Sequence, residues 1–142
     1  MQFRRDDSRP RRTLVPLSVA LIAVAAGTLY AAYEYKWREE RWTAAIALTG
    51  GDPRLGPALI RRYGCAGCHT IPGVPGATGL VGPPLRNVAQ RVYIGGVITN
   101  TPDNLMRWIA NPQAIDPKTA MPVTGISPAE AKHVAAYLYA SQ

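Results

Sequence analysis

Three chemically reactive side chains stand within five positions of a chain that otherwise almost lacks them. Cys65 and Cys68 are the two cysteines of the 142-residue sequence, and His69 is one of its two histidines. The pattern C-x-x-C-H is the attachment site of a c-type haem. Two thiols three positions apart can form thioethers with the haem vinyl groups, and the adjacent histidine can supply an axial nitrogen to the iron. We therefore expect one covalent haem c at Cys65, Cys68 and His69.

Other chemistries use similar cysteine patterns. A redox-active dithiol needs no adjacent histidine and occurs in a βαβ context, which this sequence does not indicate. A zinc site needs more ligands, and His133 is the only other histidine. A structural disulfide between Cys65 and Cys68 is the third alternative. Absence of covalent haem after expression with a haem-attachment machinery would favour zinc or a disulfide.

A second axial ligand has four candidates. Met121 is followed by a proline, in a loop 52 residues after His69, and such a stiff loop can hold a thioether over the far face of the haem. Met106 is expected inside a helix, where packing is its role. His133 is expected to be solvated, and Met1 to lie across a membrane. Ligation by histidine and methionine raises the potential of the iron and leaves no open position, which favours electron transfer over catalysis of a small-molecule reaction.

The formal charge of +7 is unevenly distributed. Five arginines precede the first apolar run, whereas eleven basic and seven acidic residues follow Tyr33 without a Lys/Arg run. The segment after Tyr33 is therefore only mildly basic, and we expect no nucleic-acid binding. Thirteen glycines and thirteen prolines predict long loops. Short helices among long loops make a poor core, which a large apolar cofactor would complete.

The run 14–33 carries no charge and, as a helix of about 30 Å, would cross the hydrocarbon core of a bilayer. The preceding arginines predict a cytoplasmic N-terminus, and the tyrosines and tryptophans that follow are typical of a membrane interface. We expect a basic cytoplasmic segment at 1–13, a retained single-pass anchor at 14–35 in a bacterial inner membrane, and a periplasmic haem domain. A cleaved signal peptide, with Ala23-Val24-Ala25 as its processing site, and a buried core helix are the alternatives.

The remaining chain divides into a helical connector at 36–50 and a globular part at 51–142. The connector should end at Gly50-Gly51 and is either a solvated stalk or a docking surface for a membrane partner. The globular part is expected to be all-α and irregular, without a strand pair. Its helices should begin at Asp52-Pro53, Thr101-Pro102 and Ser127-Pro128 and end near Tyr63, Asn111 and Ala140.

Five motifs occur together in 51–142: CAGCH, GPPL at 82–85, NLMRWI with the proline that follows it, AMP at 120–122, and AAYLY in the last helix. With them this segment, about two thirds of the chain, resembles a class I cytochrome c. With the anchor, the chain resembles the membrane-bound monohaem cytochromes c of bacterial respiratory complexes, terminal oxidases in particular. The resemblance implies an all-α class I cytochrome c fold around one covalent haem, preceded by one N-terminal transmembrane helix.

The resemblance also implies which residues hold the haem. Cys65 and Cys68 would carry the thioethers, His69 would be the proximal ligand and Met121 the distal ligand. The carbonyl of Pro83 would accept the Nδ1–H of His69, a contact that orients the imidazole and tunes its basicity.

Further residues are implied near the haem and between the helices. Arg91 and Trp108 are expected to contact a haem propionate, with a surface charge and plain core packing as the alternatives. Tyr137 is expected to pack the last helix against the first. Gly56 stands nine residues before the first cysteine, whereas the family commonly has eight, so Gly64 is the candidate for the extra residue.

The expected function is one-electron transfer by a tethered carrier, not catalysis. Its partners would be a quinol-oxidising complex, a terminal oxidase, or both, and the protein would be either a shuttle between them or a subunit of one. An electron-accepting subunit of a periplasmic dehydrogenase is the main alternative. A haem sensor or peroxidase would require an open or labile sixth position.

Overall fold

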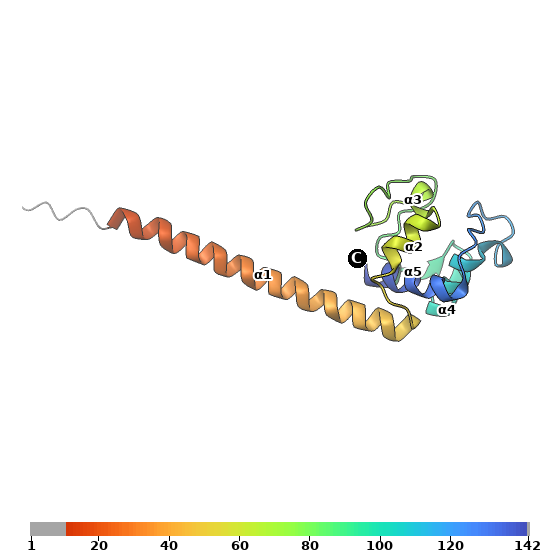
Figure 1. Ribbon diagram of the computed structural model, residues 1–142, viewed down its shortest axis with the longest axis horizontal. Coiled ribbons are helices and arrows are strands. Elements are labelled where there is room, and N and C mark those ends of the chain that lie inside the picture. The colour runs from red at the N-terminus through yellow and green to blue at the C-terminus, as the bar shows by residue number, and fades with distance from the viewer. Residues whose placement is uncertain (1–10, 142) are drawn as a thin grey trace, which may run out of the picture. The chain divides into compact units, whose positions relative to one another are not determined.

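The computed structural model describes residues 11–141, with side chains from Leu17 onward. Met1 and most of the basic segment expected at 1–13 lie outside the described residues. The chain divides into two units, Met1–Trp37 and Arg38–Gln142. Along the chain (Figure 1), its elements are α1 (Arg11–Thr49), α2 (Gly56–Arg62), α3 (Cys65–Cys68), the 3₁₀ turn η1 (Val88–Gln90), β1 (Tyr93–Ile94), β2 (Ile98–Thr99), α4 (Pro102–Ala110), the 3₁₀ turn η2 (Pro112–Ala114) and α5 (Pro128–Ala140).

Helix α1 contains a stretch, Leu17–Thr49, that is long and apolar enough to cross a membrane. Every side chain in 17–40 is exposed within this chain, which favours an anchor over the alternative of a buried core helix. Tyr33 is the last residue of the apolar run, and its ring makes an edge-to-face contact with Trp37, with the ring centroids 5.8 Å apart. The helix continues through the expected connector and ends at Thr49, because Gly50 adopts a left-handed φ of +66°.

The last turns of α1 pack within the second unit. Ala45 and Thr49 are 1% and 5% exposed, and Trp42 is half-buried. The guanidinium of Arg54 lies over the Trp42 ring, 5.9 Å from its centroid. The connector is therefore more than a solvated stalk, because its buried side chains pack within the globular unit. Only the other side of these turns is available to a partner.

Helix α5 is the centre of the globular unit and contacts both α2 and α4 (Figure 1). Its face formed by Ala131, Val134, Ala135 and Leu138 is buried, and burial extends almost all around the helix toward its end. Tyr137 packs against Gly56, where a Cβ would overlap the tyrosine side chain. The expected crossing of the first and last short helices is thus present at Gly56. Gly64, the candidate for the extra residue, adopts a left-handed φ of +72° between α2 and α3, a conformation that glycine readily allows.

Helix α2 begins at Gly56 and not at the predicted Asp52-Pro53. The N–H of Asp52 donates to Nδ1 of His133, 2.8 Å away, and its carboxylate accepts the N–H of Arg54 at 2.9 Å. Asp52 therefore caps a turn at 53–55 that leads directly into α2, and its N–H links the end of α1 to α5. The expectation that His133 is solvated is wrong for the same reason, since its imidazole is partly buried and accepts this hydrogen bond.

The predicted starts of the other two helices are correct. The hydroxyl of Thr101 accepts the N–H of Asn104 at 3.2 Å, and Ser127 and Glu130 form a reciprocal capping box. The predicted ends of both helices are also correct, since α4 stops at Ala110 and α5 at Ala140.

A short hairpin was not expected from the sequence. Strands β1 and β2 pair antiparallel around Gly95 and Gly96, which both have positive φ, as a type I′ turn requires. Two-residue strands are too short to show alternation, so only the Gly-Gly pair carried a signal. The hairpin positions Gly95 beneath the indole of Trp108, where a Cβ would overlap the ring.

Glu130 links the start of α5 to the end of α2. Its Oε2 accepts the hydroxyl of Ser127 at 2.6 Å and that of Tyr63 at 2.7 Å. These two hydrogen bonds, with the Ser127 bond the larger cause, lower the pKa of Glu130. Because the folded-state pKa lies below the unfolded one, this stabilisation is present above the ordinary pKa and is lost as the pH falls through the folded value.

We therefore expect Glu130→Gln to lower the midpoint of thermal unfolding at pH 7, and the difference from the unmodified protein to shrink below about pH 4, the ordinary glutamate range. Thermal unfolding followed by circular dichroism across pH 3–8 measures this difference in midpoint. Asp103→Asn, in the first turn of α4, is the control. A difference that does not vary with pH would contradict the assignment.

Candidate cofactor site

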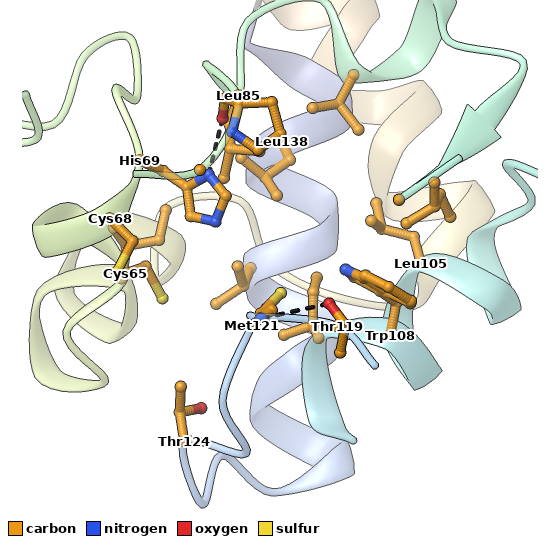
Figure 2. Close-up of a pocket in the computed structure, with 18 of the residues that line it drawn as sticks. Cys65, Cys68, His69, Leu85, Leu105, Trp108, Thr119, Met121, Thr124 and Leu138 are labelled. Carbon is orange, nitrogen blue, oxygen red and sulfur yellow. Dashed lines mark hydrogen bonds between the residues drawn. The ribbon is translucent and has the colours of Figure 1, made fainter. Parts of the chain in front are cut away.

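A cavity of about 430 Å³ lies in the globular unit, within the roughly 300–1,000 Å³ range of small-molecule and cofactor pockets. Its walls come from α2, α3, α4, α5 and the loops 81–85 and 119–126, and they are largely apolar (Figure 2). The few polar groups that reach it include two thiols, an imidazole and a thioether. An apolar chamber with so few and such specific polar groups suits a flat, largely apolar cofactor with a central metal ion.

The two cysteines occupy the ends of the single helical turn α3. Both are free thiols, both are half-buried, and both line the cavity. Burial raises the pKa of the Cys65 thiol. The N–H of His69 donates to the carbonyl of Cys65 at 3.0 Å, which ends the turn and leads the chain into an extended conformation. The turn thereby places both thiols and the following imidazole at the same wall.

A hydrogen bond on the side away from the cavity orients the imidazole of His69. Its Nδ1 lies 2.7 Å from the carbonyl oxygen of Pro83, the hydrogen bond drawn in Figure 2, and a carbonyl can only accept. This contact directs Nε2 toward the cavity. Gly82 packs flat against the ring, and a Cβ there would lie 2.6 Å from Nδ1 and closer still to Cε1. The expected contact between His69 and Pro83 is present in the structure; its role toward an iron is a proposal.

Met121 lies on the opposite side of the cavity from His69 (Figure 2). Its backbone N–H donates to the hydroxyl of Thr119 at 3.3 Å, which bends the loop so that the side chain enters the cavity. Of the rival candidates, Met106 packs against the core and His133 bonds to Asp52, and neither lines the cavity. Met1 is outside the described residues.

Arg91 and Trp108 both line the cavity, as the resemblance implied. Trp108 is 8% exposed, and its indole nitrogen points into the cavity (Figure 2). Nη2 of Arg91 donates to the carbonyl oxygens of Pro84 and Arg86, the latter at 3.1 Å. Arg91 is therefore ordered against the loop that carries Pro83 and is more than a surface charge. Contact of either residue with a haem propionate remains a prediction.

Sequence reasoning missed two supporting residues. Gly82 was noted only as part of a motif, although its missing side chain makes room for the His69 ring. Thr119 was not singled out, because a single threonine two positions before a methionine is not a recognisable signal. Gly82 could have been recognised from its position directly before Pro83, the residue whose carbonyl was expected to bond to His69.

Comparison with known proteins agrees with this chemistry. The family described as Cytochrome c matches residues 53–141. The chain is similar to cytochrome c oxidase subunit 2 of Alkalihalophilus pseudofirmus, with 33% identity over 67 residues, which cover 47% of this chain and 19% of that protein. The chain therefore spans about a fifth of the length of that relative. No solved structure matches.

Proposed function

The chain belongs to the cytochrome c family, and from that membership we propose that it is a membrane-tethered one-electron carrier with a single covalent haem. Electron transfer is the activity that the family implies; the tether, the haem count and the respiratory role are the parts we propose. The observation that carries the proposal is the placement of His69 and Met121 on opposite sides of one apolar cavity, with both cysteine thiols at its wall.

A haem bound here supplies an iron that accepts and releases one electron. The thiols of Cys65 and Cys68 would anchor the ring, and His69, oriented by Pro83, would offer Nε2 on one face. The thioether of Met121 would occupy the other face, which favours the ferrous state and raises the potential. If His69 and Met121 both held the iron, a substrate would have no position on the metal. This arrangement supports a carrier over a peroxidase or a sensor.

The membrane part of the proposal is supported by α1. Its apolar stretch is exposed along 17–40, and aromatic residues follow the run, as at a membrane interface. A tether confines the carrier to the membrane plane and raises its effective concentration near membrane partners. We propose a terminal oxidase as one such partner, because the chain is similar to a cytochrome c oxidase subunit 2. The haem domain would lie in the periplasm, since the arginines that precede the apolar run favour a cytoplasmic N-terminus.

Haem staining of a denaturing gel, run on separated membrane and soluble fractions, tests the proposal. We expect one stained band near 15.3 kDa in the membrane fraction. A shorter stained band in the soluble fraction would mean a cleaved signal and would overturn the tether but not the carrier. An unstained band with the protein present would overturn the haem. Native purification then distinguishes an oxidase from a dehydrogenase partner.

A further inference from the structure

Asn100 joins three segments behind the wall of the cavity. Its Nδ2 donates to the carbonyl oxygen of Val88 at 2.7 Å and to that of Arg91 at 2.9 Å. Its Oδ1 accepts the hydroxyl of Tyr139 at 2.8 Å. The amide group has donor hydrogens on Nδ2 and an acceptor oxygen, Oδ1. Because the two carbonyl oxygens can only accept, Nδ2 must face them, and Oδ1 faces the hydroxyl. The side chain therefore ties the end of η1 to α5.

The Tyr139 end of this link is rigid. Tyr139 belongs to the most buried helix of the unit and is itself 8% exposed. Burial raises the pKa of its hydroxyl, so the group remains a donor throughout the neutral range. Asn100 therefore fixes the backbone at Arg91 relative to α5, since it bonds to both.

From Arg91, hydrogen bonds continue to the loop 82–85, which carries the carbonyl bonded to His69. The guanidinium donates to the carbonyls of Pro84 and Arg86, and so holds the loop 82–85 from outside. From inside, the same loop is bonded to the cysteine-histidine segment by the N–H of Gly82 to Cys68 and by the N–H of Leu85 to Thr70, both at 2.8 Å. The carbonyl that receives His69 Nδ1–H lies between these attachments.

We propose that Asn100 is a positioning residue, which holds the acceptor of the His69 Nδ1–H in place through Arg91 and the loop 82–85. The inference rests on the proposed function, because His69 matters in this way only as an axial ligand. Hydrogen bonds behind a metal-binding histidine set the orientation and basicity of the ring. Asn100 would act two hydrogen bonds further back than the Pro83 carbonyl, without touching the cofactor.

The test compares two asparagines with the same local chemistry. Asn100→Leu removes the link to Arg91, at similar volume and with no change of charge. Asn104→Leu is the control, because Nδ2 of Asn104 also donates to a backbone carbonyl, that of Thr99 at 3.0 Å, but contacts neither Arg91 nor the loop 82–85. The hydrogen-exchange rate of His69 Nδ1–H, measured by NMR on the haem-loaded full chain, is the readout.

We expect exchange to be about tenfold faster or more in Asn100→Leu, as for a locally opened hydrogen bond, and unchanged in Asn104→Leu. Equal rates in the two variants, or a rate for Asn100→Leu equal to that of the unmodified chain, would overturn the inference alone. If the unmodified chain attached no haem, both the proposed function and this inference would be wrong. The absorbance band of methionine-ligated iron reports separately that the distal side is intact.

A milder pair covers the case in which Asn100→Leu does not fold. Tyr139→Phe removes one hydroxyl that bonds to Asn100, and Tyr137→Phe removes a hydroxyl from the same helix that bonds instead to the carbonyl of Pro72 at 2.6 Å. We expect about twofold to threefold faster exchange in the first and no change in the second. The reverse order, or no change in either, would overturn the inference.

Discussion

We expect Met121→Ala to lower the reduction potential of the haem domain by on the order of 0.1–0.3 V, a substantial part of the roughly 0.8 V over which axial ligands tune haem. The physical reason is that the thioether favours the ferrous state, and alanine cannot reach the iron. Potentiometric titration followed by absorbance measures the shift. The ligand-field band of methionine-bound iron should disappear in the same variant, and small ligands such as imidazole should bind.

Met106→Ala is the matched control, because Met106 packs against the core from α4 and does not line the cavity. Its truncation should destabilise the fold by about 1–3 kcal/mol, since the side chain is only partly buried, and should leave the potential unchanged. If Met121→Ala kept both the potential and the ligand-field band, the assignment of the distal ligand would be wrong and the sensor interpretation would gain support.

The second large effect is expected for Gly82→Ala. The new Cβ would overlap the His69 ring, so either the imidazole or the loop 82–85 must move. Either movement breaks the contact to Pro83 and strains the bond from the Gly82 N–H to Cys68. We expect a loss of about 2–4 kcal/mol, from overpacking and from one lost hydrogen bond, measured by thermal unfolding of the haem-loaded protein.

Gly67→Ala provides the control for this prediction. Gly67 lies in α3 between the two cysteines, and a Cβ there would meet no described atom within 4 Å. Its φ is not in the left-handed region, so alanine should be neutral or stabilising by up to about 1 kcal/mol. Equal stability of the two variants would contradict the close packing of Gly82 against His69.

Local features could be predicted from the sequence because their partners are close along the chain. The starts of α4 and α5 follow from Thr101 and Ser127, whose hydroxyls accept N–H groups three residues later. The cysteine-histidine turn is equally local. Its cofactor chemistry could be predicted because spacing alone decides whether two thiols and an imidazole reach the same face.

Several features that depend on distant contacts were predicted wrongly or missed, although the packing of Tyr137 against the first short helix was expected correctly. Asp52 has the sequence signature of a helix N-cap, but its N–H bonds to His133, 81 residues away, and α2 begins later. The same contact removes His133 from solvent. The hairpin at Gly95-Gly96 was missed because its strands have two residues each, and its position depends on the close approach to Trp108.

The sequence by itself determined the cofactor chemistry of this protein, its anchor candidate and the helix caps, because each of these depends on residue types at fixed short spacings. Only the tertiary structure decided which side chains support the imidazole of His69. Asn100 bonds to Tyr139 across 39 residues, and Arg91 bonds to the loop that faces His69, because four short helices and an irregular chain pack around the cavity. Hydrogen bonds between such remote groups follow the path of the whole chain, which no local pattern encodes.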